Sequence, residues 1–237
     1  MWHATIAVLV IAALAVQVAI AVQATAHPPG HAVGTLAGTA LAGRLVRVLS
    51  FFTIQSNVLS AITSAQLALR PDRDRPVWRV VRLDAMLGIT VTGIVYSTVL
   101  ARIHEPKGWE QVSTNTAFHY LVPIMMVMGW LLFGPRPRID ATVMRWSLLW
   151  PVLWFSYTLV HGEMTRWYPY PFTDVATNGY SRVLVNAFLV TVVLGLVALL
   201  FGVGDRRMRR APDPAATGVG AQDDSARTTP DSLGRPR

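Results

Sequence analysis

Long apolar segments with almost no charged residues alternate along this chain with short loops rich in arginine. An α-helix needs about 20 mostly apolar residues to cross the roughly 30 Å hydrocarbon core of a bilayer, and interfacial residues can extend shorter segments. Six segments meet this requirement, at residues 5–26, 46–69, 83–103, 117–133, 144–160 and 183–203. The pattern therefore predicts an all-α, polytopic membrane protein, with a bundle of six transmembrane helices over residues 1–203.

The sequence changes character after residue 203. Residues 204–237 are polar, rich in proline, glycine, aspartate and arginine, and without apolar periodicity. Such a segment cannot bury enough apolar surface to fold, so we expect a disordered cytoplasmic tail. Composition supports the membrane class, since only 14% of the residues are charged, against about a quarter in soluble domains.

The basic residues are divided unequally between the two sets of loops. The loops after the second and fourth segments, together with the start of the tail, hold twelve: Arg70, Arg73, Arg75, Arg79, Arg82, Arg136, Arg138, Arg145, Arg206, Arg207, Arg209 and Arg210. The other loops hold six: Arg44, Arg47, Arg102, Lys107, Arg166 and Arg182. The positive-inside rule then places both termini in the cytoplasm and makes this a multi-pass protein of the cell membrane.

The first segment allows a second interpretation. The sequence AVQATAHPPG contains an A-x-A-like site ending at Ala26, which is typical of signal-peptide cleavage. The segment lacks a basic N-terminal region, and its apolar run is longer than that of a usual signal peptide. We therefore expect it to be a membrane helix, and cleavage would leave five spans.

The second segment is unusually polar for a helix in lipid. On a helix that turns about 100° per residue, Asn57, Ser60 and Ser64 lie within about 40° of Thr53, and Ser56 flanks this stripe. Small hydroxyl residues favour close packing between membrane helices, which is one explanation. The other is that the stripe lines a pocket inside the bundle.

Histidines near the same membrane face as Thr53 suggest what such a pocket could do. Ionisable groups at membrane depth are candidate functional sites. His119 lies about one turn into the fourth segment with Pro123 on the same face, and Tyr157 and His161 share one stripe of the fifth. For His161, simple wetting by lipid headgroups is the favoured explanation.

A hydroxyl and an imidazole in one pocket can perform nucleophilic catalysis. A histidine of near-neutral pKa can take the proton of a threonine hydroxyl that attacks an ester carbonyl. We predict Thr53 as the nucleophile, His119 as the base, and Asn57 or Ser56 as the donor to the oxyanion. The other candidates for lining the pocket are Ser60, Tyr157 and His161.

Three ordered motifs add a family resemblance. FFTIQSN, HYLVPI and YPYPFTDV…GY, within residues 46–203, resemble the Pr-six-Pr family of bacterial six-helix membrane proteins. That family is similar to the androgen-induced and androgen-dependent multipass proteins, intramembrane threonine hydrolases of fatty-acid esters of hydroxy fatty acids. The resemblance implies a six-helix fold, with Thr53 as the hydrolase threonine and His119 as its histidine.

The loop before the sixth segment is rich in aromatic residues. Trp167, Tyr168, Tyr170 and Phe172 are typical of an aromatic belt at the membrane interface. They could also form a lid over the pocket.

Two other functions compete with the hydrolase. The chain could be a non-catalytic membrane protein, either a transporter of lipids or small molecules or an assembly factor. It could also bind haem between His119 and His161, which we regard as the weakest reading.

Composition and motifs remove several further classes. The chain has no cysteine, it has no nucleotide-binding loop, and no spacing of histidines and carboxylates fits a zinc site. Topology and anionic lipids account for the formal net charge of +8. We therefore expect no metal, no cofactor and no nucleic-acid partner, only membrane lipids and a lipid-ester substrate.

Overall fold

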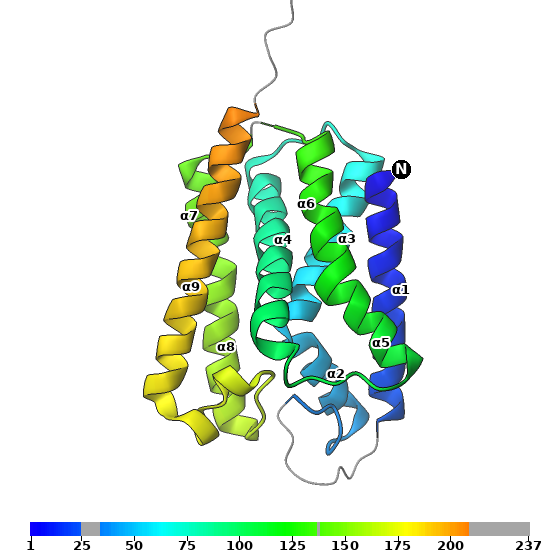
Figure 1. Ribbon diagram of the computed structural model, residues 1–237, viewed down its shortest axis with the longest axis vertical. Helices are drawn as coiled ribbons and strands as arrows, with labels where there is room; N and C mark the ends of the chain where they lie inside the picture. Colours follow the sequence, from blue (N-terminus) through cyan, green and yellow to red (C-terminus); the bar gives the residue numbers. More distant parts are fainter. Residues whose placement is uncertain (25–33, 137, 209–237) are drawn as a thin grey trace, which may run out of the picture.

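The computed structural model describes residues 1–24, 34–136 and 138–208, and within these ranges the regular structure is helical throughout. The elements are α1 (Trp2–Gln23), α2 (Leu41–Ser50), α3 (Phe52–Leu69), α4 (Pro76–Val95), η1 (Tyr96–Leu100), α5 (Gly108–Thr116), η2 (Ala117–Leu121), α6 (Val122–Phe133), α7 (Ala141–Ser147), α8 (Leu149–Thr165), η3 (Pro171–Thr173) and α9 (Val175–Arg207). Here η1 and η2 are π-helical turns continuous with their neighbours, and η3 is a 3-10 turn. The helices run along one long axis (Figure 1), so the all-α prediction is confirmed.

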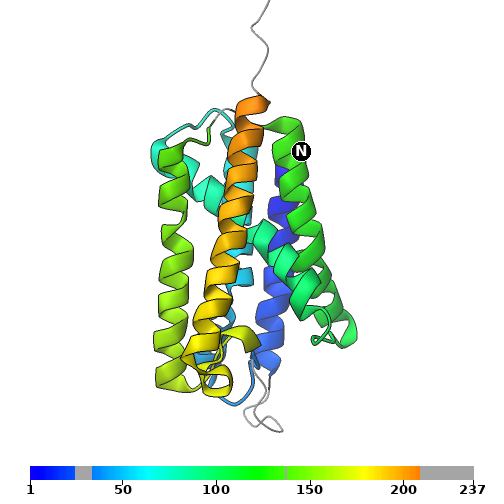
Figure 2. The ribbon, with the colours of Figure 1, turned by 60° about the vertical axis from the view of Figure 1, so that its left-hand side comes forward.

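Four helical stretches are long and apolar enough to cross a membrane. They are α1, α4 with η1, α5 through α6, and α9, with mean hydropathies between 1.6 and 2.8. The bent pair of α2 and α3 makes a fifth if it counts as one span. The pair α7 and α8, which covers the predicted span at 144–160, runs beside α9 (Figure 2) but does not meet the same criterion. A multi-pass membrane protein fits these helices, whereas the count of six spans stays a prediction.

The two sets of loops lie at opposite ends of the bundle. The N-terminus, the loop between α3 and α4, the loop between α6 and α7, and the end of α9 share one end (Figure 1). The larger set of arginines lies at this end, apart from Arg209 and Arg210, which are outside the described residues. Residues 34–40 and the loops that follow η1 and α8 lie at the other end, beside α2 and α5.

α9 extends further than the sequence predicted. It continues through Arg207, although residues 204–207 were assigned to the tail. Asp205, which is 1% exposed, accepts hydrogen bonds from the backbone N–H groups of Arg138 (2.6 Å) and Ile139 (3.0 Å). These bonds fix the last turn of α9 to the loop before α7. The rest of the predicted tail, residues 209–237, and the cleavage site at Ala26 lie outside the described residues.

α1, α3 and α4 form the centre of the bundle. Ile6 and Val10 of α1 are fully buried, and they pack with Leu83, Leu87 and other side chains of α4 in the main hydrophobic core. A side chain at Gly88 of α4 would come within 2.7 Å of the Ser56 Oγ on α3. Small residues therefore allow α3 and α4 to approach closely, as at many membrane helix interfaces.

The chain bends by 74° between α2 and α3. Phe51, between the two helices, is extended (φ −69°, ψ 127°), so carbonyls at the end of α2 lose their helical partners. Gln55 Nε2 donates to the Leu49 carbonyl and Trp154 Nε1 donates to the Ser50 carbonyl, both at 2.9 Å. Side chains thus replace the backbone hydrogen bonds that the break removes.

A single helix over residues 46–69 was expected here, and the bend is a difference with a physical reason. α8 supplies partners that a continuous helix would not need. The Trp150 indole N–H donates to Gln55 Oε1 (3.1 Å), and the Trp150 ring stacks on Phe52 with ring centroids 4.6 Å apart. Gln55, which lies off the polar stripe, therefore bridges the bend and joins it to α8.

Gln55→Leu should destabilise the protein, because it leaves the Trp150 N–H and the Leu49 carbonyl without these partners. We expect a loss of about 1–3 kcal/mol in the free energy of unfolding, measured by denaturation in detergent. Thr5→Val, which removes a hydroxyl from an exposed position on α1, is the control. Equal stability of the two variants would contradict this account of the bend.

Candidate functional site

Two cavities meet at one wall beside the bend between α2 and α3. The first, here called the apolar cavity, has a volume of about 240 Å³, lies between α3, α4, α8 and α9, and is lined mostly by apolar side chains. The second, the outer cavity, has a volume of about 490 Å³ and lies between α1, α5 and the loops at residues 34–37 and 169–171. The residues that line both are Thr53, Tyr96, Leu100, His119 and Tyr170.

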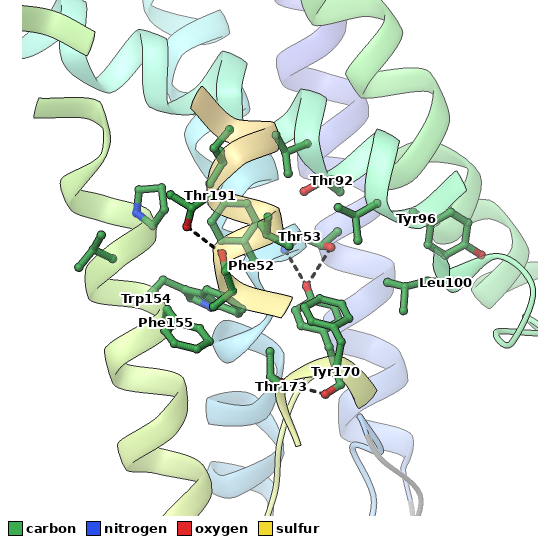
Figure 3. Close-up of a pocket in the computed structure, with 18 of the residues that line it drawn as sticks. Phe52, Thr53, Thr92, Tyr96, Leu100, Trp154, Phe155, Tyr170, Thr173 and Thr191 are labelled. Atoms are coloured by element: carbon green, nitrogen blue, oxygen red, sulfur yellow. Dashed lines mark hydrogen bonds between the residues drawn. The ribbon is translucent and has the colours of Figure 1, made fainter. Parts of the chain in front are cut away.

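Thr53 is held at this wall by the first turn of α3. Because the helix begins at Phe52, the N–H of Thr53 has no acceptor within the helix. It donates instead to the Tyr170 hydroxyl oxygen at 3.1 Å, and the Thr53 and Tyr170 hydroxyls share a second hydrogen bond of 3.1 Å. Figure 3 shows both contacts, with Tyr170 reaching Thr53 from the loop before α9. The Thr53 side chain is thus oriented by one phenol.

Tyr170 is a rigid partner. Its ring stacks on Phe172 and meets the Phe51 ring edge-on, with centroids 5.2 and 5.5 Å apart. Burial raises the pKa of Tyr170 to about 12. The phenol therefore keeps its proton at physiological pH and can donate a hydrogen bond.

His119 enters the same wall from a π-helical turn. Its ring stacks on Tyr96 with centroids 3.9 Å apart, and its Nδ1 lies 3.1 Å from the Asn115 carbonyl. A carbonyl oxygen only accepts hydrogen bonds, so Nδ1 carries the proton. Nε2 is then left with a lone pair, the form that a general base requires.

Both π-helical turns contribute to the site. Tyr96 lies in η1 and His119 in η2, and π-turns inside α-helices often occur at functional sites. The two turns lie close together because Gly93 has no side chain. A Cβ at that position would come within 3.1 Å of Pro123 and 3.3 Å of the His119 carbonyl oxygen.

Thr53 and His119 line the same two cavities. No direct hydrogen bond joins them among the contacts of the described residues, since Thr53 binds Tyr170 and His119 binds Asn115. A water or a substrate between them could connect them, as in other sites where the base acts through one water.

The rest of the polar stripe packs against neighbouring helices. Ser56 Oγ donates to the Phe52 carbonyl, Asn57 Nδ2 to the Thr53 carbonyl and Ser60 Oγ to the Ser56 carbonyl, at 2.8–2.9 Å. All three side chains are fully buried and none lines either cavity. Asn57 and Ser56 therefore do not face the space in which an oxyanion would form, contrary to the expectation for these two residues.

Tyr157 and His161 also lie outside both cavities. The Tyr157 hydroxyl is hydrogen-bonded to Ser50 Oγ at 2.7 Å, and the His161 ring stacks on Tyr157 with centroids 5.4 Å apart. These residues join α8 to the end of α2. His161 therefore does not share a cavity with His119, as a haem bound by both would need.

The aromatic loop is largely buried, which differs from an interfacial belt. Trp167, Tyr168 and Tyr170 are 4–7% exposed. Trp167 Nε1 donates to the Thr35 carbonyl (2.8 Å), and the Tyr168 carbonyl accepts from the Gly34 N–H (3.1 Å). Residues 34–37 and 169–171 line the outer cavity, and a role of this loop as a lid stays a prediction. The direct contact of Tyr170 with Thr53 was missed, and the only signal was the tyrosine between two prolines.

Comparison with known proteins adds no relative. No family model, curated protein or solved structure matches this chain. The resemblance to the Pr-six-Pr family therefore rests on the three motifs alone. Within the described residues, no group of three or more histidines and carboxylates is placed to hold a metal ion.

Tyr170→Phe should destabilise the protein by about 1–3 kcal/mol, because the buried N–H of Thr53 loses its acceptor. Tyr168→Phe is the matched control, since Tyr168 is equally buried and its hydroxyl has no hydrogen-bond partner among the described residues. Denaturation in detergent measures both. A Tyr168→Phe loss as large as that of Tyr170→Phe would show that the phenol–threonine contact contributes nothing specific.

Proposed function

We propose that this protein is an intramembrane hydrolase of lipid esters, with Thr53 as nucleophile and His119 as general base. One observation carries the proposal: both residues lie on the wall between an apolar cavity and an outer cavity with more polar side chains. An ester in an amphipathic lipid is the junction between an acyl chain and a more polar part. A lipid with its chain in the apolar cavity would place its ester at this wall.

The reaction follows from this arrangement. The Thr53 oxygen attacks the ester carbonyl while its proton passes to His119 Nε2. The acyl–alcohol bond then breaks, and the leaving alcohol takes the proton from His119. Water attacks the acyl-threonine in the second half, and the same histidine returns a proton to Thr53.

Tyr170 is the best candidate for the oxyanion donor in place of Asn57 and Ser56. Its protonated hydroxyl is already within 3.1 Å of the Thr53 oxygen and N–H. Removing one such donor typically costs about 2.7–4 kcal/mol of transition-state stabilisation.

A transporter is less well supported. It requires a path to the arginine-rich end, where the cavity found between Trp78, Arg82 and Asp205 has a volume of only about 20 Å³. That is room for about one water molecule.

We further propose that the protein lies in the cell membrane, with its arginine-rich end facing the cytoplasm. The unequal distribution of basic residues supports this orientation. The site would then lie toward the outer leaflet.

Covalent labelling in membranes with a fluorophosphonate tests the catalytic pair. Thr53→Val should abolish labelling, and His119→Gln should slow it about 100-fold or more, the usual contribution of a general base. Ser60→Ala, a buried position on the same helix but outside both cavities, should label like the wild type. Hydrolysis of p-nitrophenyl octanoate is measured in parallel.

Labelling and hydrolysis that persist in Thr53→Val would contradict the assignment of the nucleophile. A wild-type protein that shows neither signal would contradict the hydrolase itself.

The orientation can be tested with single cysteines, because the chain contains none. Asp72→Cys lies in the exposed loop between α3 and α4, and Lys107→Cys lies at the opposite end of the bundle. A membrane-impermeant maleimide should label Lys107→Cys in intact cells and Asp72→Cys only after lysis. The reverse pattern would invert the proposed topology.

A further inference from the structure

The described residues in the walls of both cavities carry no formal charge. Among the described residues that line them there is no aspartate, glutamate, lysine or arginine. The polar groups of the outer cavity are amides, hydroxyls and two imidazoles, from Gln17, Thr35, Thr53, Tyr96, His104, Gln111, Thr114, Asn115, His119 and Tyr170. The outer cavity is therefore polar without being ionic.

Two ionisable side chains near the outer cavity, His104 and Arg47, do not make its wall ionic. His104 Nδ1 is hydrogen-bonded to the Tyr96 hydroxyl at 3.1 Å, and partial burial lowers the pKa of His104, which favours the uncharged ring. Arg47 lies behind the 34–37 loop. Its guanidinium donates to the carbonyls of Thr35 and Ala37 and covers the Trp167 ring at 5.3 Å. It supports the loop and does not line the cavity.

A ligand with a charged headgroup would be poorly accommodated here. Proteins bind phosphates and carboxylates with arginine, lysine or several backbone N–H groups. A charge brought into a cavity without such partners loses its hydration and gains little in return. Hydroxyl and ester groups, in contrast, are well matched by amides and hydroxyls.

Among the described residues that line the apolar cavity, one buried hydroxyl has no hydrogen-bond partner. Thr92 Oγ1 is buried without a hydrogen-bond partner, and the residue is 5% exposed. Thr92 lies in the cavity wall near Thr53 (Figure 3). It can bind an ester oxygen placed between the two, at the start of an acyl chain.

We infer that the ligand of this site is an uncharged amphipathic lipid of the monoacylglycerol type. Its acyl chain occupies the apolar cavity and its hydroxyl-bearing part occupies the outer cavity. The inference rests on the proposed function only for the position of the ester at Thr53. It departs from the substrate that the family resemblance implies, since an ester of a hydroxy fatty acid carries a free carboxylate.

Competition against a photoactivatable ligand tests this inference. The probe is a 1-O-alkylglycerol ether with a diazirine in its chain, crosslinked to the full-length protein in detergent and mapped by mass spectrometry. The competitors are 1-O-octylglycerol and 1-O-octylglycerol 3-phosphate, which share the same chain and differ by one charged phosphate on the headgroup. We expect crosslinks to residues of the apolar cavity, and the neutral ether to compete about tenfold better or more.

Two lysine variants on α5 make the comparison sharper. Gln111→Lys places a cation in the wall of the outer cavity and should improve competition by the phosphate about tenfold. Ser113→Lys, at an exposed position outside both cavities, should leave the ratio unchanged.

The inference is overturned by equal or better competition from the phosphate in the wild type, by crosslinks outside the cavity, or by equal effects of the two lysines. Because the ethers cannot be hydrolysed, the outcome does not depend on Thr53 chemistry. A neutral-lipid preference without any esterase activity would refute the proposed hydrolase and leave this inference standing.

Discussion

The hydrogen bonds between Tyr170 and Thr53 hold together the part of the structure on which the site depends. They exist because the chain breaks at Phe51 and starts α3 afresh at Phe52, which leaves the Thr53 N–H free for a side-chain acceptor. The same break frees carbonyls that Gln55 and Trp154 bind. One interruption of a helix therefore fixes α8, the loop before α9 and the start of α3 to one another.

The overall architecture could be predicted from the sequence, because the apolar blocks and the arginine-rich loops are long-range patterns. The helical class follows from them, and so does the sorting of loops to two ends. The break at Phe51 could not be read in this way, since every residue around it fits a continuous helix. It is stabilised by Trp150 and Trp154, about a hundred positions further along the chain. The local sequence pattern cannot predict such distant partners.

The polar residues of the second segment have two different roles. Thr53, in the first turn of α3, faces the cavities, whereas Ser56, Asn57 and Ser60 return their hydrogen bonds to the backbone of their own helix. Helical periodicity put all four on one stripe, but it cannot tell a face that lines a cavity from one that packs on a neighbouring helix. Gly88 shows the difference, because it allows α4 to cover Ser56 directly.

The central claim is that the ester of a bound lipid meets Thr53 at the wall between the two cavities. The most direct measurement is the mass of the acyl-enzyme, trapped by rapid acid quench of His119→Gln after incubation with p-nitrophenyl octanoate and located by peptide mapping. The account predicts an octanoyl group on Thr53, absent from the double variant with Thr53→Val. An octanoyl group on any other residue, retained in the double variant, would contradict it.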